Sequence, residues 1–326
     1  MKKKRILALL LALTTVCLAG CSGSVEKDAA NGSGAGKSVF KIDHESCSVS
    51  EARIYLLNYQ NIYGKMYEMD VTTQEDKTES FETYVKDMTL SQLAQTVAMA
   101  ELASEQELSL DEETTNKISK AAKEYYESLT EEELNYTNAT ESEIEQMYEQ
   151  YALANLLYSS LTNSVSEEVS DNEARVMKVS QILVADEDTA KTVQDKLDAG
   201  NDFDSVAATY TEADSISLEV KRGDLPQEVE DVVFELEDGE TSDMIETSQG
   251  YYFIYCEDHY LKEETEENKQ LVAQERKTEA FESEYHAYLS SVSTKLNEDV
   301  WDQITLVTGD GYESNSFFTT YAKYCE

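Results

Sequence analysis

The sequence predicts an α+β fold, in which a mostly helical lobe carries an inserted domain with a small antiparallel sheet and flanking helices. Two observations lead to this prediction. Residues 39–165 repeat apolar side chains every three or four positions, which is the period of amphipathic helices. Residues 176–184 form a β-branched run with a polar residue at nearly every second place, as in a half-buried strand.

The first twenty residues have the pattern of an export signal. Basic residues 2–5 precede an apolar run, residues 6–16, that is too short for a comfortable membrane span. The small residues that follow end in Cys21 and resemble a bacterial lipobox, which implies that Cys21 becomes the lipidated first residue of the mature chain. The alternative is a plain secretory signal with a chance cysteine. We therefore expect export and lipid anchoring to the extracytoplasmic face of a bacterial membrane.

Residues 21–38 are rich in Gly, Ser and Ala without apolar periodicity, which predicts a flexible tether. Residues 32–38 partly match a phosphate-binding loop. However, the first glycine of that pattern is replaced by Asn31, and no hydrophobic strand precedes it. We therefore expect neither nucleotide binding nor any other cofactor.

The formal net charge is −41 for the whole sequence and −45 once residues 1–20 are removed, which leaves 22 basic against 67 acidic side chains. A field of this sign repels nucleic acid and anionic lipid, and it favours basic or unfolded cationic partners. A hydrophobic content of 40% is enough for packed domains and argues against a disordered acidic chain.

Cysteine and histidine are sparse in the predicted mature chain. Beyond Cys21 only three cysteines remain, so at most one disulfide can form within the chain, and their spacing fits no zinc motif. A bridge between Cys47 and Cys325 is conceivable if the two ends meet, and Cys256 is most simply a buried small residue. The histidines are scattered and accompany no catalytic or metal-binding pattern, so we expect no metal: His44, His259 and His286.

Four helices are expected in residues 39–165. Ser48 to Glu51 matches a capping box, and the helix behind it carries Ile54, Leu57, Ile62 and Met66 with several tyrosines. The others are expected at Phe81–Leu108, at Asp111–Leu129 and at Glu141–Leu161, with Asp111 and Thr140 as N-caps. The tyrosines and methionines are most simply interpreted as core. Their functional alternative is an adaptable cleft for hydrophobic segments.

The inserted domain continues with two helices separated by Gly200-Asn201, the second one capped by Asp202. A break at Gly223–Pro226 precedes a third amphipathic segment, Val229–Leu236. Residues 241–247 and 251–256 then predict a hairpin, for which Gly250 supplies the positive φ.

Five short motifs in this domain match, in order, those of a known family. They are Gln181-Ile182-Leu183-Val184, Ala199-Gly200-Asn201-Asp202-Phe203-Asp204-Ser205-Val206-Ala207, Gly223-Asp224-Leu225, Phe234-x-Leu236-x-x-Gly239-Glu240 and Thr247-x-x-Gly250-Tyr251. In both order and spacing, residues 170–258 resemble the parvulin family of peptidyl-prolyl isomerases.

The resemblance implies a site for a twisted prolyl amide. Rotation about this bond faces a barrier of roughly 18–20 kcal/mol, so a catalyst must bind the twisted amide better than the planar one. Parvulins offer an apolar cup and a polar cluster that includes two histidines. The matching positions here are Gln181 and Tyr252 for the histidines, Val229 for the aromatic wall, Asp214 for a polar residue and Thr247 for a hydroxyl.

Several of these positions depart from the family pattern. The histidines and the aromatic wall are substituted, and the family's glycine-rich segment before the third helix is missing because Leu225 runs almost directly into Gln227. We therefore expect a parvulin fold whose isomerase activity is weak or lost and whose cup still binds extended peptide. In the simpler interpretation Gln181 and Tyr252 are inward residues of a sheet that has lost its catalytic role, Val229 is core and Asp214 is solvated surface. The alternative is a rebuilt active site at these positions.

A further amphipathic helix follows residue 259, and a helix with an apolar face must bury it against a neighbour. We expect residues 259–326 to pack on residues 39–165. This layout resembles extracytoplasmic foldases of the PrsA and SurA type, which implies a chaperone for unfolded exported polypeptides. The alternative is an active isomerase that assists folding of secreted proteins. A solute-binding protein would show two large β/α lobes, which are not predicted.

Overall fold

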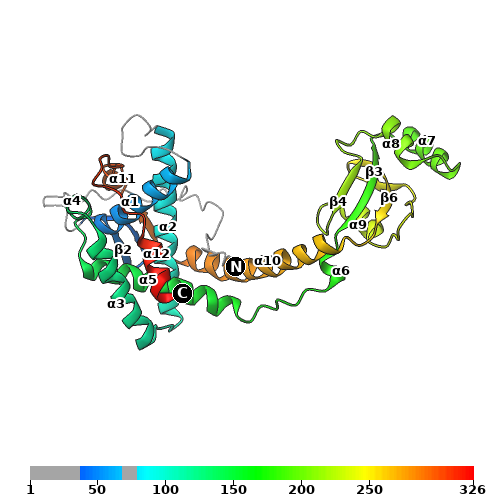
Figure 1. The fold of residues 1–326 in the computed structure, drawn as a ribbon. Helices are drawn as coiled ribbons and strands as arrows, with labels where there is room; N and C mark the ends of the chain where they lie inside the picture. The colour runs from blue at the N-terminus through cyan, green and yellow to red at the C-terminus, as the bar shows by residue number, and fades with distance from the viewer. Residues whose placement is uncertain (1–36, 68–78) are drawn as a thin grey trace, which may run out of the picture. The chain divides into compact units, whose positions relative to one another are not determined.

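The computed structural model describes residues 37–67 and 79–326, and it confirms the α+β class (Figure 1). The chain divides into two compact units. One contains the described residues up to Leu161 together with Ser283–Glu326, and the other is the inserted stretch Thr162–Glu282. The predicted signal peptide, Cys21 and residues 21–36 of the predicted tether lie outside the described residues. Within the described part, no helix is both long and apolar enough to cross a membrane.

Local capping signals place the helices of the first unit. The hydroxyl of Ser48 accepts the N–H of Glu51 at 3.1 Å, and the Glu51 carboxylate accepts the N–H of Ser48, so the predicted capping box is confirmed. Asp111 and Thr140 are also caps, as predicted. The helices that fall mainly in this unit are α1 Val49–Met66, α2 Glu79–Glu105, α3 Glu112–Ser128, α4 Glu131–Thr137, α5 Glu141–Thr162, α11 Glu298–Trp301 and α12 Phe317–Cys325.

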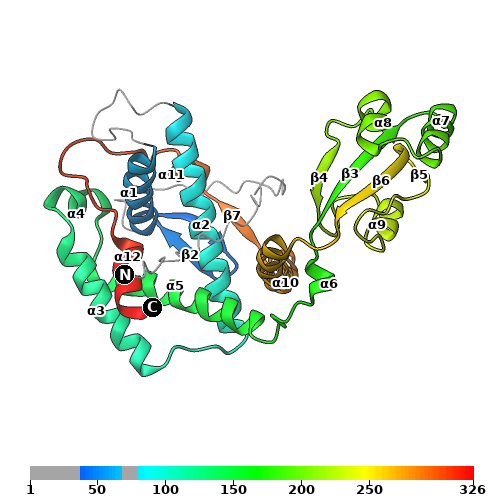
Figure 2. The same ribbon diagram turned by 45° about the vertical axis from the view of Figure 1, so that its right-hand side comes forward.

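The prediction that residues 39–165 are helical throughout is wrong at the start of this range. β1 (Ser38–Ile42) and β2 (Glu45–Ser48) form an antiparallel hairpin, and β7 (Thr294–Leu296) pairs with the other edge of β1 (Figure 2). Asp43 makes the turn with a positive φ of 45°. The short strand β1 is stable only beside its partners β2 and β7, and β7 comes from the far end of the sequence.

The C-terminal segment packs on the first unit from Ser283 onward, whereas residues 259–282 belong to the second unit. Phe317 at the start of α12 is fully buried, and its ring lies 5.2 Å from that of Tyr55 and 4.5 Å from that of Tyr148. Upstream, the side-chain amide of Gln60 exchanges two hydrogen bonds with the backbone of Val307, at 2.8 and 2.9 Å. Although the tail lies on this unit, Cys47 and Cys325 are both free thiols, so the conceivable bridge between them is not formed.

The second unit is built on a four-stranded antiparallel sheet with the order β4-β3-β6-β5. The edge strand β4 and the short helix α6 were not foreseen, and the expected hairpin is shorter than predicted, because Thr241 makes only an isolated bridge to Tyr255. The elements are α6 Asp171–Ala174, β3 Met177–Val184, α7 Glu187–Asp198, α8 Phe203–Tyr210, β4 Ser217–Val220, α9 Gln227–Val233, β5 Ile245–Thr247 and β6 Gly250–Asp258. Helix α10 (Lys262–Ser291) begins in this unit and ends in the first.

Alternation along the strands gives this sheet two buried faces. Met177 and Val179 of β3, with Ile254 and Cys256 of β6, pack with Val229 and Val233 of α9. Ile182, Val184 and Phe253 point the other way, into the core formed with α7 and α8. Since successive side chains of a strand alternate between faces, Gln181 lies on the α9 face, between Val179 and Leu183.

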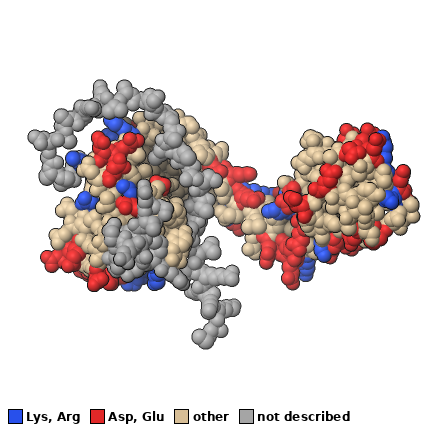
Figure 3. All heavy atoms as spheres, turned by 90° about the horizontal axis from the view of Figure 1, so that it is seen from above, with Lys and Arg blue, Asp and Glu red and all other residues tan. Residues whose placement is uncertain are grey.

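Many of the charged side chains on the face shown in Figure 3 are acidic. The few ion pairs that involve more than one element include Lys178 with Glu257 at 2.9 Å and Lys323 with Glu124 at 2.5 Å. The excess of carboxylates in the composition is therefore carried on the surface, where it is solvated.

Candidate functional site

Three of the five positions that the sequence assigned to a parvulin site lie on the α9 face of the sheet. Gln181 on β3 is 8% exposed and Tyr252 on β6 is 5% exposed. Val229, in the first turn of α9, is fully buried and packs in the same core cluster as Tyr252. The pairing of Gln181 with Ile254 and of Leu183 with Tyr252 fixes the two polar side chains close to each other on adjacent strands.

The amide of Gln181 is engaged with the loop after α8. Its Nε2 donates to the carbonyl of Ser215 at 2.9 Å, while its backbone N–H donates to the carbonyl of Ile216 at 2.8 Å. The side chain therefore holds the loop beside β3. An amide has a second N–H to donate but does not titrate, so it cannot exchange a proton as an imidazole does.

The hydroxyl of Tyr252 donates to Oε1 of Gln249 at 2.8 Å. Burial raises the pKa of Tyr252, so its hydroxyl stays neutral at physiological pH. Thr247 lies in the same turn, where its hydroxyl donates to the carbonyl of Gly250 at 2.9 Å and accepts the N–H of Gln249 at 3.0 Å. Gln249 was not among the residues predicted from the sequence. The sequence signal that could have identified it is its position three residues before Tyr252, across a tight turn.

Among the described residues, no hydrogen bond or ion pair joins the side chain of Asp214 to these groups. It is exposed in the loop between α8 and β4, and within the described part of the chain no hydrogen bond or ion pair holds its carboxylate. The neighbouring residue Ser215 is the one that Gln181 binds. The structure thus places Asp214 on the loop that borders the site without joining its side chain to the site.

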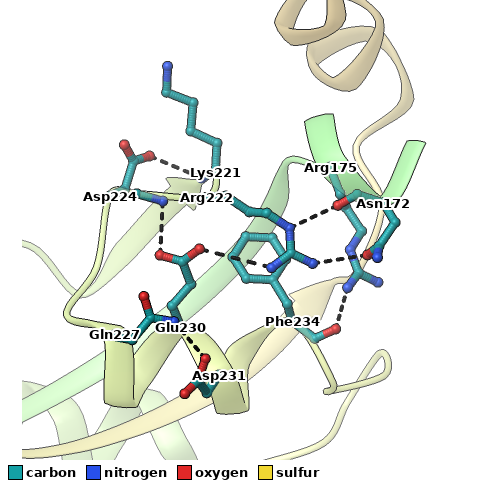
Figure 4. Close-up of polar contacts among 10 residues, drawn as sticks. Asn172, Arg175, Lys221, Arg222, Asp224, Gln227, Glu230, Asp231 and Phe234 are labelled. Carbon is teal, nitrogen blue, oxygen red and sulfur yellow. Dashed lines mark hydrogen bonds and ion pairs between the residues drawn. The ribbon is translucent and has the colours of Figure 1, made fainter. Parts of the chain in front are cut away.

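The connection between β4 and α9 occupies the place where the family's glycine-rich segment is missing (Figure 4). The N–H of Lys221 donates to the carboxylate of Asp224 at 3.0 Å, and the N–H of Gly223, at a φ of 92°, donates to Glu230 at 2.9 Å. Glu230 is only 9% exposed, and Nη1 of Arg222 lies 4.0 Å from its second oxygen. A buried carboxylate therefore closes a tight turn here in place of a longer loop.

Two guanidinium groups flank the ring of Phe234, just after α9. Arg222 lies 4.3 Å and Arg175 lies 5.3 Å from the ring centroid, within the range of cation–π contacts (Figure 4). Arg222 also donates to both the backbone and the side-chain oxygen of Asn172, each at 3.0 Å. These contacts join α6 to the end of α9. We call Asn172, Arg175, Arg222, Glu230 and Phe234 the arginine cluster.

One group of side chains in the described part has the spacing of metal ligands. Asp238, Asp258 and His259 each offer an atom within 4.8 Å of the others. Oδ1 of Asp238 already accepts two hydrogen bonds from His259, from the backbone N–H at 2.6 Å and from Nδ1 at 2.8 Å. The trio is partly exposed, and within the described part of the chain its hydrogen bonds do not include Gln181 or Tyr252.

The chemistry available on the α9 face is hydrogen bonding to a peptide beside an apolar wall. Gln181, Tyr252 and Gln249 offer neutral donors and acceptors, and partly buried Leu183 and Leu225 border the core beneath them. Because amide rotation requires neither a nucleophile nor a metal, such groups can bind a prolyl peptide. Acceleration of the rotation would require that they bind the twisted amide better than the planar one.

Comparison with known proteins agrees with this geometry. The family model described as a PPIC-type PPIase domain matches residues 139–267. Foldase protein PrsA 3 of Bacillus cereus is 32% identical over 157 residues, which are 45% of this chain and 54% of that protein. Foldase protein PrsA of Geobacillus kaustophilus is 31% identical over 150 residues, or 44% of this chain and 52% of that protein.

The chain thus spans about half the length of these two relatives. A longer and weaker match is Foldase protein PrsA of Caldanaerobacter subterraneus, 27% identical over 280 residues, which cover 78% of this chain and 83% of that protein. Among solved structures, PrsA from Bacillus cereus aligns with 77% of this chain and 96% of its own, at 21% identity and a TM-score of 0.39. The chain therefore contains a parvulin domain of the PPIC type and is homologous to the PrsA foldase proteins.

Proposed function

We propose that this protein assists the folding of exported polypeptides. In this proposal the first unit binds unfolded segments. The parvulin domain serves as a second peptide site, and its isomerase activity is weak or lost. The homology to foldase proteins and the PPIC-type domain support a role in folding.

The observation that carries the proposal concerns the two positions at which the parvulin pattern has histidine and this chain does not. Gln181 and Tyr252 occupy them, and the side chain of each donates one hydrogen bond within the domain, to Ser215 and to Gln249 respectively. Neither side chain exchanges a proton near neutral pH. A site built from these groups can hold a peptide by hydrogen bonds but lacks the imidazole pair of the family pattern.

Exposed apolar side chains on the first unit support its role in binding. Met66 is 56% exposed, Tyr67 is 54% exposed and Tyr84 is 38% exposed. The rings of Tyr67 and Tyr84 lie 6.2 Å apart, so these two exposed groups are neighbours, and we call them the tyrosine patch. Methionine and tyrosine adapt to many partners, because one is flexible and the other combines an apolar body with a polar tip.

The location is part of the same proposal. The lipobox pattern that ends at Cys21 would hold the mature chain on the extracytoplasmic face of the membrane, with residues 21–38 as a tether. Metabolic labelling with a clickable fatty acid tests this in cells. We expect label on the wild-type chain and none on the Cys21→Ala variant, and equal labelling of the two would refute the anchor.

An active isomerase is the second candidate. It is favoured by the turn of Thr247, Gln249 and Tyr252, which places two hydroxyls and an amide beside the α9 face. In this alternative the Tyr252 hydroxyl would leave Gln249 and bind the rotating carbonyl of the peptide.

Suppression of aggregation tests the binding role directly. The mature chain with Cys21→Ser is mixed with a reduced, unfolded protein, and light scattering is followed over time. We expect the chain with the unaltered patch to lower the scattering. The Tyr67→Ala/Tyr84→Ala variant should leave it close to the level seen without added chain. Leu271→Ala, which removes an equally exposed apolar side chain from the second unit, is the matched control. Unchanged scattering with any amount of the wild-type chain would overturn the proposal.

A further inference from the structure

A surface pocket of about 470 Å³ lies in the first unit, between α2 and the segment that contains β7 and α11. It is distinct from the parvulin site and from the tyrosine patch. Its lining residues are Glu82, Thr83, Lys86, Asp87, Leu90, Leu296, Glu298, Trp301 and Asp302.

The inner part of the pocket is apolar and aromatic. Trp301 is only 6% exposed, and Leu90 and Leu296 are partly buried on either side of the pocket. Such a surface suits the hydrocarbon part of a long side chain, because lysine and arginine bury their methylene groups along apolar surface while the charged end stays in a polar environment.

The rim of the pocket is acidic. Four carboxylates line it against one ammonium, that of Lys86. Lys86 donates to the carbonyl of Trp301 at 3.1 Å and lies 5.0 Å from the centroid of the indole ring. Among the residues that the structure describes, none of the four carboxylates forms a salt bridge, with Lys86 or with any other cation. Within the described residues, the carboxylates of the rim therefore outnumber the single ammonium of Lys86.

This combination fits an organic cation better than other ligands. The Lys86 ammonium already shows that the indole ring and the Trp301 carbonyl stabilise a positive charge. Phosphates and acidic peptides would be repelled, and a purely apolar segment would have to desolvate the carboxylates. A metal ion is also a poor fit, because within the described residues only the trio at Asp238, far along the chain, comes close enough together for chelation.

We propose that this pocket binds a lysine or arginine side chain of an extended, basic segment in an unfolded client chain. The aliphatic stem would lie against Leu90 and Leu296, with the charged end among Glu298, Asp302 and Asp87. The inference rests on the proposed client-binding function and names the class of segment that the first unit selects. The excess negative charge of the whole chain would draw such segments toward it.

The protein carries its own probe for this site, because Trp301 is the single tryptophan of the sequence. The mature chain with Cys21→Ser is titrated with a peptide of alternating lysine and alanine, which has no aromatic residue, under selective tryptophan excitation. A matched peptide has glutamine in place of lysine. We expect a saturable change in Trp301 emission with the lysine peptide alone, and a weaker affinity as salt is raised. Equal responses to the two peptides would overturn the proposal.

The variant Glu298→Gln/Asp302→Asn removes two charges from the rim while it keeps the shapes of the side chains. We expect its affinity for the lysine peptide to fall by about two- to thirty-fold, from the usual energies of exposed charge pairs. The control Glu112→Gln/Asp310→Asn removes two exposed carboxylates elsewhere in the same unit. An equal loss in the control would mean that only the overall charge matters, and would contradict a specific pocket.

Failure of this inference can be told apart from failure of the proposed function. If the chain suppresses aggregation of an unfolded protein but the lysine peptide leaves Trp301 emission unchanged, the pocket assignment is wrong and the chaperone role stands. If the lysine peptide binds at Trp301 but no unfolded protein is protected, the pocket is a cation site and the chaperone role is wrong.

Discussion

The backbone N–H of Phe317 donates to Oδ1 of Asn58 at 3.0 Å, although 259 positions of sequence separate the two residues. Asn58 is fully buried in α1, and its Nδ2 donates to the hydroxyl of Tyr125 on α3 at 2.6 Å. The side-chain amide of Asn58 thus joins α1, α3 and α12. The hydroxyl of Tyr148 on α5 also donates to the carbonyl of Phe317, at 2.7 Å. The C-terminal helix is therefore an integral part of the first unit.

Replacement of Asn58 by alanine should destabilise this unit strongly. The change leaves the N–H of Phe317 buried without its acceptor, which costs about 1–3 kcal/mol. Urea unfolding followed through Trp301 fluorescence measures the loss. Asn315→Ala, which removes an exposed amide two residues from Phe317, is the control and should leave the midpoint nearly unchanged. A midpoint for Asn58→Ala equal to that of the control would show that the contact contributes little.

Stability of the first unit should fall at alkaline pH because of its buried tyrosines. Burial raises the pKa of Tyr125 from 10.0 to about 12. A group whose pKa is higher in the folded state stabilises that state below the unfolded pKa, and this contribution is lost as pH rises through the folded value. The free energy of unfolding should thus decline between pH 10 and pH 12. Tyr125→Phe should reduce this slope, and an unaltered slope in that variant would contradict the assignment.

Glu230 should be required for the turn that replaces the family's glycine-rich segment. Glu230→Gln weakens its acceptance of the Gly223 N–H and removes the charge beside Arg222. We expect the parvulin domain to lose about 1–2 kcal/mol of stability, as for a charged hydrogen bond. Asp231→Asn is the matched control, because Asp231 is exposed on the same helix. Amide exchange of β4 and α9 reports the difference, and equal protection in the two variants would mean that the arginine cluster does not depend on the carboxylate.

Gly250 should tolerate no side chain at the hairpin between β5 and β6. Its φ is 131°, and a Cβ placed there would lie 2.5 Å from the carbonyl oxygen of Val184. Gly239 has a positive φ of 82° but nothing within 4 Å, so alanine there meets only backbone strain. We expect Gly250→Ala to lower the melting temperature of the parvulin domain clearly more than Gly239→Ala. The reverse order would contradict the close approach of Gly250 to the backbone of Val184.

Local sequence signals predicted much of this fold. Ser48, Asp111, Thr140 and Asp202 cap helices as their side-chain chemistry indicates, because a cap depends on contacts within three residues. The position of Gly250 followed from turn geometry for the same reason. The motifs of the parvulin domain predicted the strand β3 and the hairpin of β5 and β6, but not the edge strand β4.

The features that were missed depend on contacts between distant segments. The strand β1 is stable beside β7, whose Leu296 faces Phe40 across most of the sequence, and no local pattern records that pairing. The arginine cluster likewise brings together Asn172 of α6, Arg222 of the connection after β4 and Phe234 after α9. Each of these residues alone looks like an ordinary surface or core residue, so the cluster appears only when the domain is folded.

The central claim is that the parvulin site binds peptide without efficient isomerisation, and exchange NMR tests it most directly. The mature chain with Cys21→Ser is added to a panel of Xaa-Pro peptides in which the residue before proline is varied, and cis–trans exchange peaks are measured. We expect shifted or broadened peptide resonances with exchange rates close to those of the free peptides. Acceleration that disappears in Tyr252→Phe or Gln181→Ala would contradict the claim and would identify a rebuilt isomerase site.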